Sequence, residues 1–238
     1  MVDDDDEGVV LSVRGEARRM VTPDAAKLSG SVTARREGRE QALAAAASAL
    51  DRLTGELAGL GGTPLRGSER TALTWSAFSA TSHTEWLHDK ETGRSRSTGQ
   101  VVAAVDVSVT ARALELLGAL GAVLARQDDF DVWQVSWEVD DDNPQWAAVR
   151  SDAVAAALSK GRDYAAALGA SLRRVEHVAD AGLLAGAGDQ VLHRGFSSAA
   201  RAAGGDGEPS TPSLDPLPQE LIAVVEARLR TSPATLPG

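Results

Sequence analysis

A change in hydrophobic period near Gly38 constrains the fold of this chain more than any other feature. Before it, apolar and polar residues alternate, which predicts a β-strand with one polar face. The apolar set of this strand is Leu28, Gly30, Val32 and Ala34. After it, apolar residues recur every three or four positions up to Gly61 and Gly62, which predicts a helix of about five turns. The seam of this helix consists of Leu43, Ala46, Leu50, Leu53, Leu57 and Leu60.

The same two periods predict the remaining elements. Further strands are expected over residues 9–14, 71–87, 99–110, 133–139, 172–179 and 221–229, and further helices over 113–126 and 144–169. Asn143 and Pro144 suit the cap and the first position of the last helix. A polar turn at 90–94 predicts that two long strands form a hairpin. The chain is therefore expected to be α+β, with a mixed, largely antiparallel sheet and two or three long helices.

A short sequence occurs twice in the chain. The segment Ser31–Arg35 reads SVTAR, and Ser108–Arg112 repeats it. Each copy is expected to end a strand just before a helix. The match in both sequence and position predicts two related strand–helix–strand units.

Composition along the chain predicts one domain with mobile ends. Residues 1–7 are acidic and are expected to form a disordered tail, followed by a single α+β domain over 8–196. Residues 197–218 are rich in Gly, Pro and Ser, which is typical of a flexible loop. Residues 219–231 are expected to return as a terminal strand of the same domain, and 232–238 to form a tail.

Charge and composition exclude several classes of function. The formal net charge is −10, and no Lys/Arg-rich stripe occurs. Binding to nucleic acid or to an anionic membrane surface is therefore disfavoured. No run approaches the ~18 apolar residues of a membrane helix, so no membrane insertion is expected. The acidic leader is unlike a secretory signal, which predicts a cytoplasmic protein; a mature exported protein without its signal is the alternative.

No pattern in the chain predicts catalysis, a cofactor or a metal. The chain has no cysteine. The only cluster of His and acid residues, 83–89, lacks the helical spacing of a zinc protease. The acidic run 140–142 lacks the pattern of a calcium loop and is better explained by helix capping. No nucleophile elbow or phosphate-binding glycine loop occurs. The protein is therefore expected not to be an enzyme.

Two apolar surfaces are candidates for binding. The helical seam must be buried, against either the protein's own sheet or a helix of another copy. Trp133 and Trp137 fall on one face of a predicted strand, where they serve either core packing or a ligand groove or assembly seam. The residues of a candidate oligomer or ligand face are Leu43, Leu50, Leu53, Leu57, Trp133 and Trp137.

Several segments, taken in order, resemble the bacterial SIMPL-domain family. The first is Val9–Ala17 with Thr22–Ala26, followed by a Val-rich strand and the Ala-rich helix. The second is the helix from Ala147 to Gly169, and the third is the strand that begins with Leu217–Leu221 after a low-complexity gap. The resemblance covers nearly the whole chain.

The resemblance implies an α+β fold, ring-like homo-oligomers and a role in stress defence, and it carries over no catalytic residue. Family members are commonly exported, whereas this chain has an acidic leader. The first hypothesis is thus a non-enzymatic, homo-oligomeric scaffold or stress-related interaction protein. The alternative is a small-ligand or peptide binding module that uses the tryptophan-bearing sheet face. A third hypothesis, an enzyme, requires a site that no sequence motif reveals.

Overall fold

The structure is a computed structural model that describes residues 8–67, 70–88, 93–181 and 214–235. The acidic residues 1–7 lie outside this part of the chain, as does most of the segment expected to be a flexible loop. The described residues form helices and strands in largely antiparallel sheets, so the α+β prediction is confirmed.

The described chain divides into two compact units, which differs from the expected single domain over 8–196. Residues 8–21, 141–181 and 218–235 belong to the first unit, and the rest of the described chain to the second. The strands form two sheets, one in each unit. Alternation along a sequence predicts a strand but not its partners, which is why the division was not foreseen.

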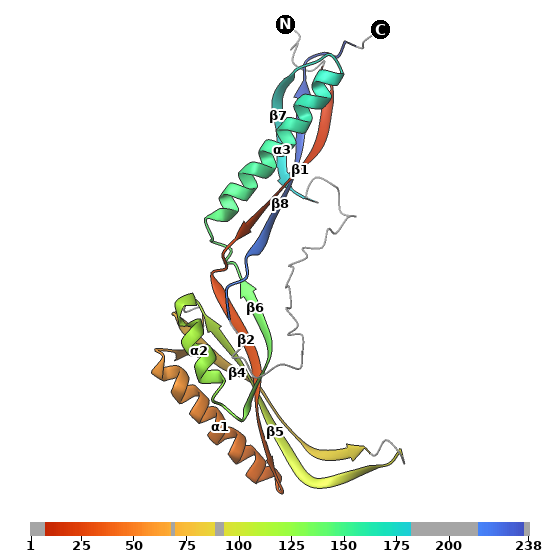
Figure 1. Cartoon of the computed structure of the whole chain (residues 1–238). Helices are drawn as coiled ribbons and strands as arrows, with labels where there is room; N and C mark the ends of the chain where they lie inside the picture. Colours follow the sequence, from red (N-terminus) through yellow and green to blue (C-terminus); the bar gives the residue numbers. More distant parts are fainter. Residues whose placement is uncertain (1–7, 68–69, 89–92, 182–213, 236–238) are drawn as a thin grey trace. The chain divides into compact units, whose positions relative to one another are not determined.

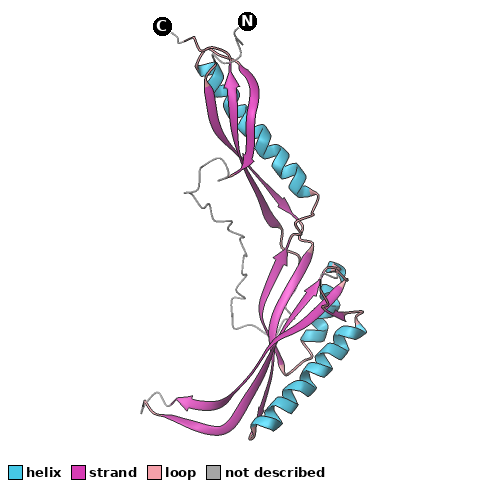
Figure 2. Ribbon diagram, turned by 180° about the vertical axis from the view of Figure 1, so that it is seen from behind, coloured by secondary structure: helices cyan, strands magenta, loops and turns pink. Residues whose placement is uncertain are grey.

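In the first unit, one helix covers one face of a three-stranded antiparallel sheet (Figures 1 and 2). The elements are β1 (Val10–Val21), β8 (Gln219–Thr231), β7 (Leu172–Asp180) and α3 (Gln145–Ala167), with strand order β1-β8-β7. The predicted terminal strand is confirmed. It pairs with β1 over the full length of that strand, from Val10 opposite Arg230 to Val21 opposite Gln219.

Helix α3 lies close to the sheet because the residues at the contact are small. Ala153 and Ala157 are fully buried. A Cβ atom added to Gly15 of β1 would lie 2.0 Å from the carbonyl oxygen of Ala153 and 2.5 Å from the backbone nitrogen of Ala157. At Gly161 of the helix, a Cβ atom would lie 2.2 Å from a methyl group of Leu229. Any side chain at position 15 must therefore move the helix.

In the second unit, helices cover one face of a five-stranded sheet (Figure 2). The strands are β2 (Ala25–Arg36), β3 (Thr63–Pro64), β4 (Leu73–His88), β5 (Ser95–Ala111) and β6 (Phe130–Glu138), in the order β3-β4-β5-β2-β6. The helices are α1 (Arg39–Gly59), the short 3₁₀ turn η1 (Leu114–Leu116) and α2 (Leu117–Leu124). The predicted β4–β5 hairpin is confirmed. The helix expected over 113–126 is shorter, because its first turn is the 3₁₀ turn η1 and α2 covers only Leu117–Leu124.

The two SVTAR segments lie at the ends of neighbouring strands. The first lies near the end of β2, before α1, and the second overlaps the end of β5, before η1. The expected position of both copies is confirmed. Strands β2 and β5 pair antiparallel, with Ser29 opposite Ser108. A relation between two strand–helix–strand units stays a prediction.

The buried face of α1 is an alanine stripe that continues into leucines. The buried residues are Ala42, Ala46, Ala49, Leu53 and Leu57. At the first end of the helix, Ala42 and Ala46 pack on Ala34 and Ala103 of the sheet. Since these contacts join small side chains, the helix approaches the sheet closely. Leu43, which follows Ala42 in the sequence, lies outside these contacts and is 38% exposed. The predicted helix is thus confirmed, and Ala46 of the predicted seam is buried. Ala42 and Ala49 are buried in place of the neighbouring Leu43 and Leu50.

The predicted helix boundaries are confirmed by their hydrogen bonds. Helix α1 ends at Gly59 and is followed by the cap residue Leu60 and by Gly61, which has a φ of +81°. The amide of Gly62 donates to the carbonyl oxygen of Leu57 over 2.9 Å, as in a Schellman cap. At the start of α3, the Asn143 side chain accepts a hydrogen bond of 2.9 Å from the Gln145 amide.

Candidate functional site

The face of the five-stranded sheet that points away from α1, called the open face here, carries short hydroxyl side chains. Residues directly opposite each other on paired strands share a face. The pairing therefore places two polar rows across four strands. One row is Thr74, Thr110, Lys27 and Ser136, and the next is Ser76, Ser108, Ser29 and Gln134.

A hollow of about 330 Å³ lies over these rows. Hydroxyl-bearing residues of β2, β4 and β5 line it together with Leu65, Trp75 and Phe78. Lys27 is its only charged lining residue. Among the residues that the structure describes, no carboxylate lies within ion-pair distance of this lysine. The hollow thus combines apolar walls, hydroxyl groups and one positive charge.

The hollow lies beside a free strand edge. Strand β3 pairs with β4 only at Thr74 and Trp75, and it ends at Pro64, which has no amide hydrogen to donate. The Leu65 amide makes one last hydrogen bond of 2.7 Å to the carbonyl oxygen of Trp75. Beyond this point, no strand of the described chain pairs with the outer edge of β4. A bulge at Phe78 leaves that residue without a partner on β5 and 58% exposed.

The far end of the β4–β5 hairpin extends beyond the rest of the sheet. The pairing of β2 with β5 ends where Arg36 lies opposite Val101. We call the remaining two-stranded part, residues 85–88 and 95–100, the arm. Figures 1 and 2 show it curving away from α1. Its tip residues Trp86 and Leu87 are 62% and 51% exposed.

Polar contacts hold the base of the arm. The Glu85 carboxylate accepts hydrogen bonds from Arg35 Nε over 3.3 Å and from Thr98 Oγ1 over 3.2 Å. At the far end of the arm, a ring nitrogen of His88 is hydrogen bonded to Ser95 Oγ over 3.0 Å. Glu85 and His88 belong to the cluster that the sequence analysis considered for metal binding. Within the described ranges, no group of three His, Asp or Glu side chains is arranged to hold a metal ion.

Asp140, the first residue of the acidic run, is held differently from the expected helix cap. Its carboxylate accepts a hydrogen bond of 2.5 Å from Arg112 and also pairs with Arg70 over 3.4 Å. Its amide donates to the Asp24 carboxylate over 2.8 Å. Asp140 therefore joins the start of β2 to the end of β5, and Asn143 provides the helix cap.

The six residues predicted as a candidate oligomer or ligand face lie at different depths. Leu53 and Leu57 are buried in the core of the second unit, and Leu50 packs against that core. Leu43 is exposed. Trp137 also packs against the core, whereas Trp133 is 56% exposed. The cause is a bulge in β6, which leaves Trp133 without a partner on β2. The structure thus does not bring the six together on one surface.

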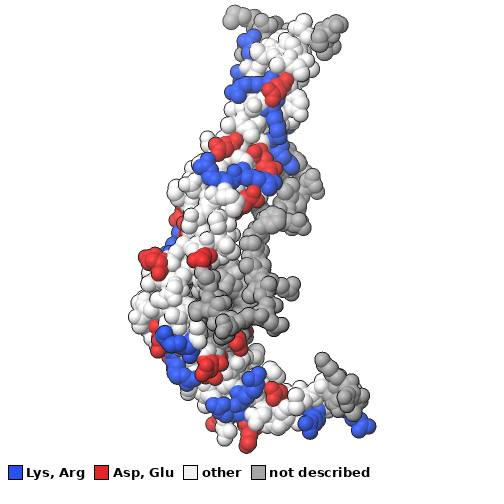
Figure 3. Space-filling view, in the orientation of Figure 1, with Lys and Arg blue, Asp and Glu red and all other residues white. Residues whose placement is uncertain are grey.

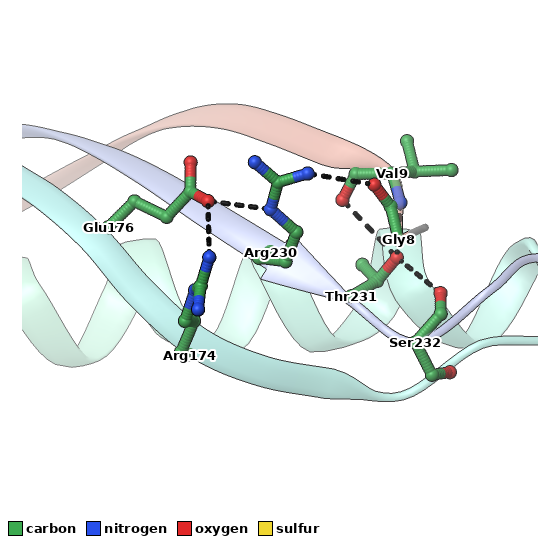
Figure 4. A network of polar contacts seen from close by, with 7 residues as sticks. All are labelled: Gly8, Val9, Arg174, Glu176, Arg230, Thr231 and Ser232. Carbon is green, nitrogen blue, oxygen red and sulfur yellow. Dashed lines mark hydrogen bonds and ion pairs between the residues drawn. The ribbon is translucent and has the colours of Figure 1, made fainter. Parts of the chain in front are cut away.

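Ion pairs cross the face of the first unit's sheet that lies opposite α3. Arg14 pairs with Glu226 over 2.8 Å. Figure 4 shows a second group, in which the Glu176 carboxylate accepts from Arg230 over 2.6 Å and also pairs with Arg174 over 3.6 Å. Figure 3 shows positive and negative side chains interspersed over the visible surface of this unit. Such a balanced, solvated face favours neither polyanions nor polycations.

Acid is expected to weaken the first unit through Glu176. The hydrogen bond from Arg230 lowers the pKa of Glu176, and the charges of Arg230 and Arg174 act in the same direction. A carboxylate with a lowered pKa in the folded state stabilises the fold above its unfolded pKa of about 4.3, and this contribution disappears as the pH falls through the folded value. The wild type should therefore melt at a higher temperature than Glu176→Gln at pH 7. The difference should vanish in acid below the lowered pKa, and a difference that is independent of pH would contradict this account.

These features define an α+β protein with two strand–helix units, one of which carries a hydroxyl-lined hollow and a projecting hairpin arm. The family model described as "SIMPL: Protein of unknown function (DUF541)" matches residues 11–229. The chain belongs to the SIMPL family. No curated protein matches it. Among the described helices, none is sufficiently long and apolar to cross a membrane.

Sequence reasoning missed the hollow and the free edge. The floor of the hollow consists of short Ser and Thr side chains that are spread over β2, β4 and β5, and only the strand register brings them together. One signal was present: Pro64 follows the glycine pair that ends α1, and a proline at a strand edge cannot continue the hydrogen bonding.

Proposed function

We propose that this SIMPL protein is a non-enzymatic scaffold that assembles with further copies of itself through the hairpin arm. The observation that carries the proposal is the exposed arm itself. A two-stranded ribbon is at best marginally stable in water, and this one presents a tryptophan and a leucine at its end. Burial of these side chains in a partner supplies the stabilisation that the arm lacks within one chain.

The chemistry of the hollow supports binding rather than catalysis. Lys27 is the only titratable residue among those that line it. General acid–base catalysis needs complementary groups that donate and accept protons at the same substrate. Two described acids of the sheet are engaged elsewhere, since Asp106 accepts a hydrogen bond from Ser31 and Glu85 is held by Arg35. A role in stress defence is a further proposal and rests on the family resemblance alone.

The double variant Trp86→Ser with Leu87→Ser tests the role of the arm. In sedimentation experiments on the full chain at equal concentration, the wild type should sediment as an oligomer and the variant as a single chain. Because the loss of an aromatic hot spot weakens an interface by at least about 30-fold in the dissociation constant, the shift should be clear at micromolar concentration.

Tyr164→Ser is the matched control for this experiment. Tyr164 lies on α3 and is 57% exposed, close to the exposure of Trp86. Its replacement should leave the sedimentation unchanged, and circular dichroism should confirm that all variants are folded. The arm has no role in assembly if the double variant sediments as the wild type does.

A further inference from the structure

The hollow and the free edge of β4 together form a site for strand addition. Backbone donors and acceptors at an unpaired strand edge bind an incoming extended segment, and a pocket next to that edge selects one of its side chains. Here β3 ends at Pro64, and the hollow begins at the same point, between Leu65 and Phe78. The site therefore suits an extended segment that carries one large side chain.

The lining of the hollow matches an indole ring. Leu65 and Phe78 offer apolar and aromatic contact. The Lys27 ammonium, which has no described carboxylate partner, suits the electron-rich face of the ring. Hydroxyl oxygens on the floor, such as that of Ser76, can accept a hydrogen bond from the indole N–H group. An indole ring satisfies all three kinds of wall at once and fills more of the hollow than the smaller phenol ring of a tyrosine does.

The chain carries such a segment at the tip of the arm. Trp86 lies in an extended strand and is 62% exposed. It cannot enter the hollow of its own chain, because Phe78 and Trp86 lie on the same strand and are separated by about 26 Å at ~3.3 Å per residue. A second copy can bring its arm to the site without this restriction.

We propose that the hollow of one copy, together with the β4 edge from Ser76 onward, receives the arm of a second copy, and that Trp86 fills the hollow. This inference rests on the proposed self-assembly and specifies its contact. The donor patch and the acceptor patch are different surfaces, so the contact is heterologous. Each copy both gives and receives an arm, and repetition leads to a ring or to an open filament.

A mixing experiment tests the contact. One variant lacks the tip (Trp86→Ser with Leu87→Ser), and the other lacks the hollow (Lys27→Ser with Phe78→Ser). Each variant alone should be a single chain by light scattering. An equimolar mixture should form a species of twice the chain mass and nothing larger, because only one intact tip and one intact hollow remain in each pair. Trp133→Ser, which alters the other strongly exposed tryptophan of the second unit, should keep the wild-type mass.

The outcomes separate this inference from the proposed function. A wild-type chain that is always monomeric overturns both. A wild-type oligomer whose mass is unchanged in the folded hollow variant leaves the scaffold in place but overturns the contact, and the hollow is then free for a small ligand. If both variants are monomeric and their mixture forms no pair, the contact is also overturned, because tip and hollow then do not complement each other. Circular dichroism confirms that each variant is folded.

Discussion

Replacement of Leu57 by alanine is expected to lower the free energy of unfolding of the second unit by about 2–5 kcal/mol. Leu57 is 0% exposed, so the substitution removes buried methyl groups and leaves a cavity between α1 and the sheet. Urea unfolding followed by tryptophan fluorescence measures the change. The second unit dominates this signal because it contains four of the five tryptophans, namely Trp75, Trp86, Trp133 and Trp137.

Leu43→Ala is the control on the same helix. Leu43 is 38% exposed, so its truncation should change the free energy of unfolding by less than about 0.5 kcal/mol. The protein concentration must be equal in all experiments, since assembly adds to the apparent stability. Equal effects of the two substitutions would contradict the packing of α1, because they would mean that both sides of the helix are equally covered.

Replacement of Gly15 by valine is expected to destabilise the first unit by about 3 kcal/mol. The new side chain would overlap backbone atoms of α3, which cannot rotate away as the end of a flexible side chain can. The helix must therefore move off β1 and give up its contact with the small residues that face it. Hydrogen exchange of the β8 amides, which pair with β1, measures the loss.

Gly55→Ala is the opposite case. Gly55 lies inside α1, and no atom lies within 4 Å of an added Cβ. Because alanine favours a helix over glycine, this substitution should raise the stability of the second unit by up to about 1 kcal/mol.

If Gly15→Val leaves the hydrogen exchange of the β8 amides unchanged, the close packing of α3 on β1 is wrong.

The elements of this fold could be predicted from the sequence because their signals are local. Alternation predicted the strands, and Gly61 and Asn143 predicted two helix ends. The burial of α1 was predicted only in part, because the choice between an alanine stripe and a leucine seam depends on Ala34 and Ala103 in the sheet below. Small partners distant in sequence decided this packing, and no local pattern shows them.

The candidate site depended on information that is not local. The spacing of Trp133 and Trp137 in an alternating segment predicts that both lie on one face of the strand. A bulge in β6 instead leaves Trp133 exposed, while Trp137 packs against the core. A second bulge places Phe78 at the hollow. A bulge inserts one residue on one strand only, and its position follows from pairing with the neighbouring strand. The exposed arm was predicted as part of a hairpin. The sequence did not show that β2 is too short to pair with the part of β5 beyond Val101, which leaves the arm as two strands only.

The molar mass of the wild-type chain in solution tests the central claim most directly. A single chain has a mass of 24.7 kDa. Light scattering coupled to size exclusion should give a multiple of this mass at micromolar concentration, because the arm and the β4 edge need a partner. A mass of one chain at every concentration would contradict self-assembly through the arm.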